Sequence, residues 1–139
     1  MTGTADSQEC NEWATSFFRT PMKDQVAEFA TFPLEKQYKV FICGNQVVHP
    51  PAIYLAEPFA RGGRATVDLL KLKLAKASDD VTINDITVVF AEIASQRTYH
   101  VARDVELMRT IRTKIDGMKN ERWKRISTER LNRITSFAR

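Results

Sequence analysis

The sequence predicts an all-α protein of about seven helices arranged in antiparallel hairpins. Apolar residues recur at helical spacing along most of the chain, most regularly in residues 64–76 and 82–96. Prolines and glycines mostly fall between these segments, where they end one helix or begin the next. The run Thr87–Phe90 has strand propensity by itself, but the helical period of the longer segment outweighs it.

The length and composition predict one globular domain. The chain has 139 residues, of which 43% are hydrophobic and 27% are charged. Folding at this length buries roughly two-thirds of the unfolded surface, so stability requires neither a metal nor a disulfide. We expect a flexible N-terminal tail over residues 1–8, a single all-helical domain over residues 9–135, and a frayed C-terminus over residues 136–139.

In the first half of the chain, prolines mark where helices are expected to begin. The expected helices run from Gln8 or Cys10 to Phe18, from Pro21 to Ala30, from Pro33 to Val48 and from Pro51 to Ala60. Pro58 lies inside the last of these, where it removes a hydrogen bond and clashes with the preceding turn. We therefore expect a kink there, or a split into two short turns. Gly44 weakens its helix or lets a neighbour approach closely.

The second half carries the more regular helical patterns. Residues 64–76 form an amphipathic helix, and residues 82–96 form the helix that we expect to be most buried. Thr82 with Asp85 resembles a capping box, Asp104 is expected to cap the next helix, and Asn120 the last one. The inward stripe of the last helix is expected to contain Trp123, Ile126 or Ser127, Arg130 and Ile134.

Two short internal echoes suggest a repeat. Residues 67–71 (Val-Asp-Leu-Leu-Lys) match residues 105–109 (Val-Glu-Leu-Met-Arg) in chemistry, 38 positions later, and residues 55–60 resemble residues 90–94 with an offset of 35. Through these segments the chain resembles the HEAT-like and armadillo-like arrays of helical hairpins, whose period is about 40 to 47 residues. The resemblance implies an architecture and no particular binding residues. A compact helical bundle would give the same spacing, and both interpretations stay open.

Charge is distributed unevenly along the chain. Residues 97–139 hold 12 of the 21 Lys and Arg and 5 of the 17 Asp and Glu, so they carry +7, whereas residues 1–96 carry −3. Such an asymmetry steers oppositely charged partners toward the basic segment, although a solvated helical face gives the same composition.

The two cysteines, Cys10 and Cys43, leave two alternatives open. They can form one disulfide in an oxidising compartment, or they can remain two buried structural thiols. Neither cysteine belongs to a C-x-x-C pair or to a zinc-like cluster, so we expect no metal site.

Two segments are candidates for binding. In Arg61-Gly62-Gly63-Arg64, backbone amides and flanking arginines could hold a phosphate, although a glycine turn between two helices explains the same residues. In the basic C-terminal segment, Arg122, Trp123, Lys124 and Arg125 place an aromatic ring among cations, as a partner-binding or nucleic-acid surface would. The tentative partner-binding set consists of six of these residues: Arg61, Arg64, Arg122, Trp123, Lys124 and Arg125.

These observations favour a non-enzymatic protein–protein interaction module, for which a small inhibitor or immunity-type protein is one concrete form. The alternative is a nucleic-acid-binding accessory domain that uses the basic C-terminal helices. No known catalytic motif is present, and we expect neither enzymatic activity nor a cofactor. No apolar run approaches the roughly 20 residues of a membrane span. As it stands the chain is expected to be cytoplasmic, or exported if a signal peptide has been removed; its oligomeric state stays open.

Overall fold

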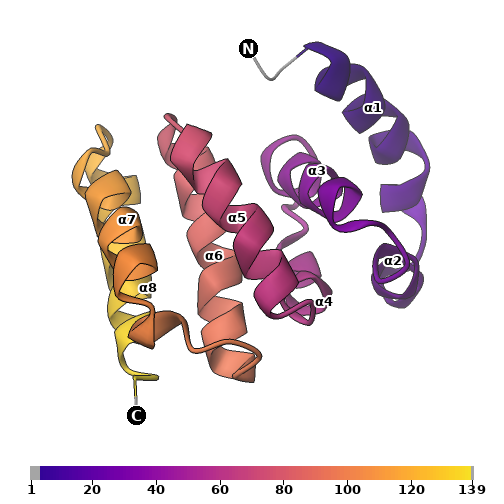
Figure 1. Ribbon diagram of the computed structural model, residues 1–139. Coiled ribbons are helices and arrows are strands. Elements are labelled where there is room, and N and C mark those ends of the chain that lie inside the picture. The colour runs from indigo at the N-terminus through magenta and orange to yellow at the C-terminus, as the bar shows by residue number, and fades with distance from the viewer. Residues whose placement is uncertain (1–3, 139) are drawn as a thin grey trace. The chain divides into compact units, whose positions relative to one another are not determined.

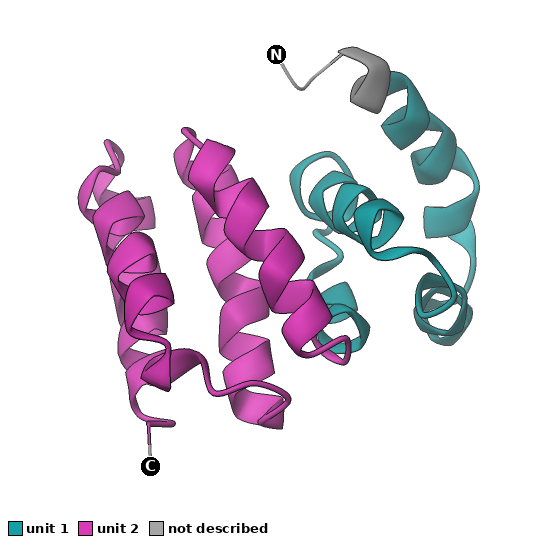
Figure 2. Cartoon of the chain, viewed as in Figure 1, with its two compact units in different colours: residues 1–59 teal, residues 60–139 magenta. Residues whose placement is uncertain are grey.

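The computed structural model describes residues 4–138, with side chains from residue 8 onward. Within this range the chain forms eight α-helices and three 3₁₀ turns and contains no β-strand, which confirms the all-α prediction (Figure 1). The chain divides into two compact units, residues 1–59 and residues 60–139 (Figure 2). The single domain over residues 9–135 stays a prediction, and residues 1–3 and 139 of the expected end segments lie outside the described range.

The first unit combines helices of 12, 8, 13 and 5 residues with two 3₁₀ turns. Its elements are α1 (Thr4–Thr15), a 3₁₀ turn (Phe17–Arg19), α2 (Met22–Phe29), α3 (Leu34–Gln46), a 3₁₀ turn (Ile53–Leu55) and most of α4 (Ala56–Ala60). α1 begins earlier than the sequence suggested and ends at Thr15, since Phe17 starts a separate turn. The expected split near Pro58 is present, because a 3₁₀ turn precedes the five-residue α4.

Phenylalanine side chains form the core of this unit. Phe59 packs against Phe29 and Phe41, with ring centroids 5.9 and 5.8 Å apart, and all three rings are almost completely buried. Two buried glutamines close the ends of helices nearby: Gln25 Nε2 donates to the carbonyl of Thr20 (2.8 Å), and Gln37 Nε2 donates to the carbonyl of Phe29 (3.0 Å). These bonds satisfy carbonyls that short helices leave without intrahelical partners.

The second unit consists of two helical hairpins. α5 (Arg64–Lys76) and α6 (Asp80–Gln96) form the first, and α7 (Val105–Asp116) and α8 (Glu121–Thr135) form the second, with a 3₁₀ turn (Val101–Arg103) before α7. Figure 1 shows α5 and α7 in one layer and α6 and α8 behind them. Helices within a layer are parallel, because the start of α6 contacts the start of α8 through Asp80 and Asn120, and the end of α5 contacts the end of α7 through Ala77 and Lys114.

The two hairpins follow one another with a constant offset. α7 begins 41 residues after α5, and α8 begins 41 residues after α6. The same offset relates buried positions in both layers: Leu70 to Ile111, Leu74 to Ile115, Phe90 to Leu131 and Ile93 to Ile134. The N-caps Asp79 and Asn120 are also 41 residues apart.

The offsets of 38 and 35 residues suggested by the sequence are therefore not the structural register. In the structure, the residue of the second hairpin that is equivalent to Val67 is Met108. The sequence echo instead paired Val67 with Val105, three positions earlier. A shift of three residues is nearly one helical turn, so the misaligned segments still place apolar residues on similar faces. The second echo paired α4 with α6, which are not equivalent helices.

α6 is the central helix of the second unit, as predicted. Ile83, Ile86, Val89, Phe90 and Ile93 are each at most 3% exposed. The predicted capping box is wrong, because α6 starts at Asp80 and its N-cap is Asp79, whose carboxylate accepts from the amide of Thr82 (3.0 Å). Asp104 and Asn120 cap α7 and α8 as predicted.

The inward face of α8 contains two of the predicted residues, Ser127 and Ile134, together with Leu131, which was not predicted. Ser127, Leu131 and Ile134 are its buried residues, whereas Trp123 and Ile126 are only half-buried. A small serine lies in the buried stripe because α8 packs closely against α6, the most extensive helix–helix contact in the described chain.

Candidate functional site

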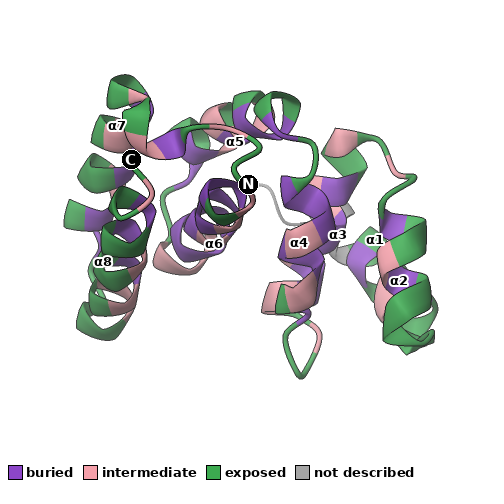
Figure 3. Ribbon diagram, turned by 90° about the horizontal axis from the view of Figure 1, so that it is seen from below, coloured by how far each residue is buried: buried purple, intermediate pink, exposed green. Residues whose placement is uncertain are grey.

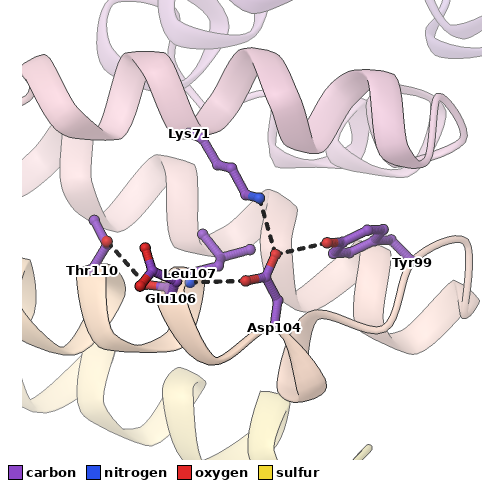
Figure 4. A network of polar contacts seen from close by, with 6 residues as sticks. All are labelled: Lys71, Tyr99, Asp104, Glu106, Leu107 and Thr110. Atoms are coloured by element: carbon purple, nitrogen blue, oxygen red, sulfur yellow. Dashed lines mark hydrogen bonds and ion pairs between the residues drawn. The ribbon is translucent and has the colours of Figure 1, made fainter.

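A polar network at the start of α7 fixes this helix against α5 (Figure 4). The Asp104 carboxylate accepts from the amide of Leu107 (3.0 Å) as the N-cap, from the hydroxyl of Tyr99 (2.7 Å), and from Lys71 Nζ (3.0 Å) on α5. One carboxylate thus joins three segments of the second unit.

The network shifts the acidity of its members. Burial alone would raise the pKa of Asp104, but hydrogen bonds from Tyr99, from the Leu107 amide and from Lys71 outweigh it and hold the pKa below its ordinary value of 3.8. The hydrogen bond to Asp104 is the main reason that the pKa values of Lys71 and Tyr99 are raised. At neutral pH the cluster is therefore an ionised aspartate held between a protonated lysine and a protonated tyrosine.

Two further contacts hold the end of the second hairpin at which α7 ends and α8 begins. Lys114 Nζ donates to the carbonyls of Ala77 (2.8 Å) and Ala75 (3.3 Å), which are among the carbonyls left without partners where α5 ends. The Asp80 carboxylate accepts from the amides of Lys119 (3.1 Å) and Asn120 (2.8 Å) in the turn between α7 and α8. Each hairpin therefore satisfies backbone groups of the other.

A buried polar contact joins α6 to α8. The amide oxygen of Asn84 accepts from the hydroxyl of Ser127 (3.3 Å) and from the guanidinium of Arg130. Burial lowers the pKa of Arg130, and Arg133 adds to that effect while Asp85 opposes it. An arginine nevertheless remains charged, so Arg130 serves packing between the two helices.

The opposite face of α8 is basic and exposed. Arg122, Arg125 and Arg133 lie at helical spacing on the side away from Ser127, Leu131 and Ile134. Figure 3 shows that exposed and buried stretches alternate along α8. None of the three guanidinium groups forms an ion pair with an acidic side chain in the part of the chain that the structure describes. Glu129 is an exposed acidic residue on the same face, one helical turn from Arg125 and from Arg133. On α7, Arg112 and Arg109 are also exposed, and Arg109 pairs with Glu106 in a solvated contact that contributes little stability. We call these five arginines the basic face.

The tentative partner-binding residues of α8 divide into two pairs. Arg122 and Arg125 belong to the basic face, whereas Trp123 and Lys124 are half-buried. The sequence placed Trp123 on the inward stripe, but it did not predict that Lys124 is half-buried, because this depends on how α8 contacts its neighbours.

Arg61-Gly62-Gly63-Arg64 forms the corner before α5. Gly63 has φ +58, and a Cβ at this position would stand 3.1 Å from the carbonyl oxygen of Thr98. Its amide donates to the carbonyl of Ala60 (3.1 Å), and the Thr98 hydroxyl donates to the same oxygen (3.1 Å). The Gly63 amide is thus engaged within the corner, and Arg61 and Arg64 are exposed beside it. These contacts favour the glycine turn over the phosphate loop.

Cys10 and Cys43 lie in the first unit and are joined by a disulfide. Their Cα atoms are 5.5 Å apart, and both residues are buried. The bridge connects α1 to α3.

The residues that sequence reasoning overlooked are those that join the hairpins: Lys71, Asp80, Asn84 and Tyr99. Their partners lie 33 to 46 residues away or in a neighbouring turn, so no local pattern marks them. Asn84 alone carried a signal, as a polar residue within the apolar stripe of α6.

Among the residues described, no cluster of three or more His, Cys, Asp or Glu side chains has the geometry to hold a metal ion. None of the described helices is long and apolar enough to cross a membrane. Comparison with known proteins returned no matching family model, no matching curated protein and no matching solved structure.

Proposed function

We propose that this protein is a non-enzymatic protein–protein interaction module of the HEAT-like helical-hairpin type, and that the basic face binds an acidic surface on a protein partner. The observation that carries this proposal is the row of exposed arginines on α8 without acidic partners in the described chain. Arginine is the cation best suited to interface ion pairs, because its planar group binds carboxylates in a bidentate way.

The constant 41-residue offset of the two hairpins supports the repeat type. It falls within the period of about 40 to 47 residues that is typical of HEAT and armadillo repeats. Stacked hairpins of this kind present extended faces and bind through them, instead of through an enclosed cleft. An inhibitor or immunity-type protein that covers an acidic partner is one concrete form of this function.

Charge reversal on the basic face tests the proposal. We expect the variant Arg122→Glu/Arg125→Glu to lose the partner that the wild-type protein captures from its native source, whereas Lys23→Glu/Lys76→Glu, with the same charge change on exposed residues elsewhere, retains it. The measurement is quantitative mass spectrometry of the captured proteins at low salt. A partner retained equally by both variants would refute the role of the basic face.

The alternative is a nucleic-acid-binding accessory domain, which one observation favours: half-buried Trp123 lies next to Arg122 and Lys124 on α8, so a base could stack beside phosphate contacts. In that case the affinity for an oligonucleotide should fall steeply with salt concentration. Charge reversal at Arg122, Lys124 and Arg125 should weaken binding to every sequence alike. Absence of binding to DNA and RNA at low salt would exclude this alternative.

A further inference from the structure

The first unit has a pocket on its surface that is open to solvent. The pocket has a volume of about 250 Å³ and aromatic walls formed by Trp13, Phe17 and Phe32. Phe17 and Phe32 pack against each other with ring centroids 5.7 Å apart, so these two rings form one wall of the pocket. This volume is slightly below the roughly 300 to 1,000 Å³ of sites for drug-sized molecules, so the pocket suits a small group.

The polar groups of the pocket can accept hydrogen bonds. The hydroxyl of Ser16 donates to the carbonyl of Glu12 (2.7 Å), and the hydroxyl of Thr20 donates to the carbonyl of Phe17 (2.7 Å). Because each hydroxyl has a single proton, both oxygens can offer a ligand only lone pairs. A ligand that donates hydrogen bonds fits them better than a carboxylate does.

The two charged residues of the pocket differ in their engagement. The Lys36 ammonium lies 4.0 Å from the centroid of the Phe32 ring, so this cation is already held by an aromatic face. The Glu28 carboxylate is exposed and makes no ion pair or hydrogen bond with another described residue. The first unit also has an acidic excess, with seven Asp and Glu against four Lys and Arg in residues 1–59. This excess of acidic residues over the unit favours a positively charged ligand over an anion, whereas Lys36 opposes it within the pocket.

We propose that this pocket binds an organic ammonium group with a small apolar body, seated against Trp13 and paired with Glu28. Aromatic faces attract such cations through the negative potential above the ring, and a nearby carboxylate adds a counter-charge. Lys36 competes with the ligand through its like charge and its place on Phe32. The ammonium group belongs either to a free amine or to a lysine side chain of a protein; the pocket chemistry is the same for both.

Fluorescence of Trp13 tests the proposal directly. The chain has two tryptophans, so the full-length variant Trp123→Phe leaves Trp13 as the only indole reporter. We expect saturable quenching by phenethylamine and by phenethyltrimethylammonium at concentrations up to about 10 mM, and no saturation by 3-phenylpropionate, which carries the opposite charge.

Two substitutions in this background should act in opposite directions. Glu28→Gln should weaken phenethylamine binding roughly fivefold, whereas Lys36→Met should strengthen it by removing the competing cation. Glu129→Gln, which removes an exposed carboxylate from α8, should leave the affinity for phenethylamine unchanged. Circular dichroism confirms that each variant retains its helical content. A lysine-containing peptide that binds more tightly than phenethylamine identifies a protein side chain as the source, and weaker peptide binding identifies a free amine.

The proposal is overturned if no ammonium probe saturates the fluorescence change, or if Glu28→Gln leaves the affinity unchanged. It is equally overturned if 3-phenylpropionate binds and Lys36→Met abolishes that binding, because the pocket would then select anions. None of these outcomes depends on the basic face of α7 and α8, so this proposal and the proposed function can fail separately.

Discussion

The two units of the chain are stabilised by different means. The first contains helices of 12, 8, 13 and 5 residues, packed through phenylalanine rings, two buried glutamines and a disulfide. The second contains helices of 13, 17, 12 and 15 residues, packed through aliphatic side chains and Phe90 in two similar hairpins. Short helices bury little area and leave a larger share of their backbone groups without intrahelical partners, so they depend more on side-chain bonds and cross-links.

The polar contacts of the two units differ in the same way. In the first unit, Gln25 and Gln37 donate to carbonyls 5 and 8 residues away, close along the chain. In the second, Asp80 and Lys114 reach backbone groups 37 to 40 residues away, in the neighbouring hairpin. The amide nitrogens of these two glutamines therefore close neighbouring turns of the first unit, whose long-range contacts are the phenylalanine rings, the disulfide and the bond from the Tyr54 hydroxyl to Gln25. In the second unit, polar side chains join one hairpin to the other.

The largest expected effect is on the second unit. Phe90→Ala should lower the free energy of unfolding by about 3 to 5 kcal/mol, because it leaves a cavity around a fully buried side chain in α6. Urea denaturation followed by Trp123 fluorescence in a Trp13→Phe background measures it. Leu72→Ala, at a 63% exposed position of α5, should cost less than about 0.5 kcal/mol. A loss below about 1 kcal/mol for Phe90→Ala would show that the aliphatic core does not depend on α6.

The second effect concerns the disulfide of the first unit. The double variant Cys10→Ser/Cys43→Ser should lose about 3 to 4 kcal/mol, since the bridge closes a loop with a sequence separation of 33. Cys10 is the only buried residue of α1 among those whose side chains are described, so α1 should also detach. Hydrogen exchange of the α1 amides and Trp13 fluorescence measure this. Unchanged protection of α1 would mean that half-buried Trp13 and Ala14 suffice to hold it.

The third effect tests close packing in the first unit. A Cβ at Gly44 would stand 2.8 Å from Phe18 Cζ and 2.9 Å from Ala52 Cβ. Gly44→Ala should therefore destabilise by about 1 to 2 kcal/mol, because overpacking exceeds the gain in helix propensity. Gly117→Ala is the matched control in the second unit, where the nearest atoms are 3.6 Å away, and it should be neutral or slightly stabilising. Thermal melts compare the two. Stabilisation by Gly44→Ala would indicate that the first unit is less tightly packed than the contacts imply.

The smallest effect concerns the polar network of the second unit. Asp104→Ala should cost about 1 kcal/mol at pH 7, as loss of an N-cap does, and more than Asp79→Ala, whose carboxylate caps α6 without the Lys71 and Tyr99 contacts. The pKa of Asp104 is lower in the folded state than in the unfolded chain. Its stabilisation is therefore fully present above about pH 4 and is lost as the pH falls through the folded-state pKa. Urea denaturation between pH 7 and pH 3 should show that the difference in unfolding free energy between the wild type and Asp104→Ala becomes smaller as the pH falls. A difference that stays constant would contradict this role of the carboxylate.

The candidate sites were predictable to different degrees. The basic C-terminal segment is visible in the sequence as a charge excess, and Arg122 and Arg125 are exposed in the structure. Arg130 and Lys114 belong to the same basic segment, yet Arg130 contacts Asn84 on α6 and Lys114 bonds the carbonyl of Ala77 after α5. Charge alone cannot distinguish these roles, because the distinction depends on distant partners. The aromatic pocket carried no motif, although six of the eight phenylalanines lie in the first 59 residues.

The sequence by itself determined which segments are helical and where two of them begin. Helical periodicity and the caps at Asp104 and Asn120 are local properties, since the side chain bonds an amide three residues away. Only the tertiary structure decided the 41-residue register, the inward face of α8, the Cys10–Cys43 bridge and the pocket beside Trp13. The physical reason is that a helix shifted by one turn presents a nearly equivalent apolar stripe. Contacts between residues far apart in the chain are needed to choose one alignment over the other.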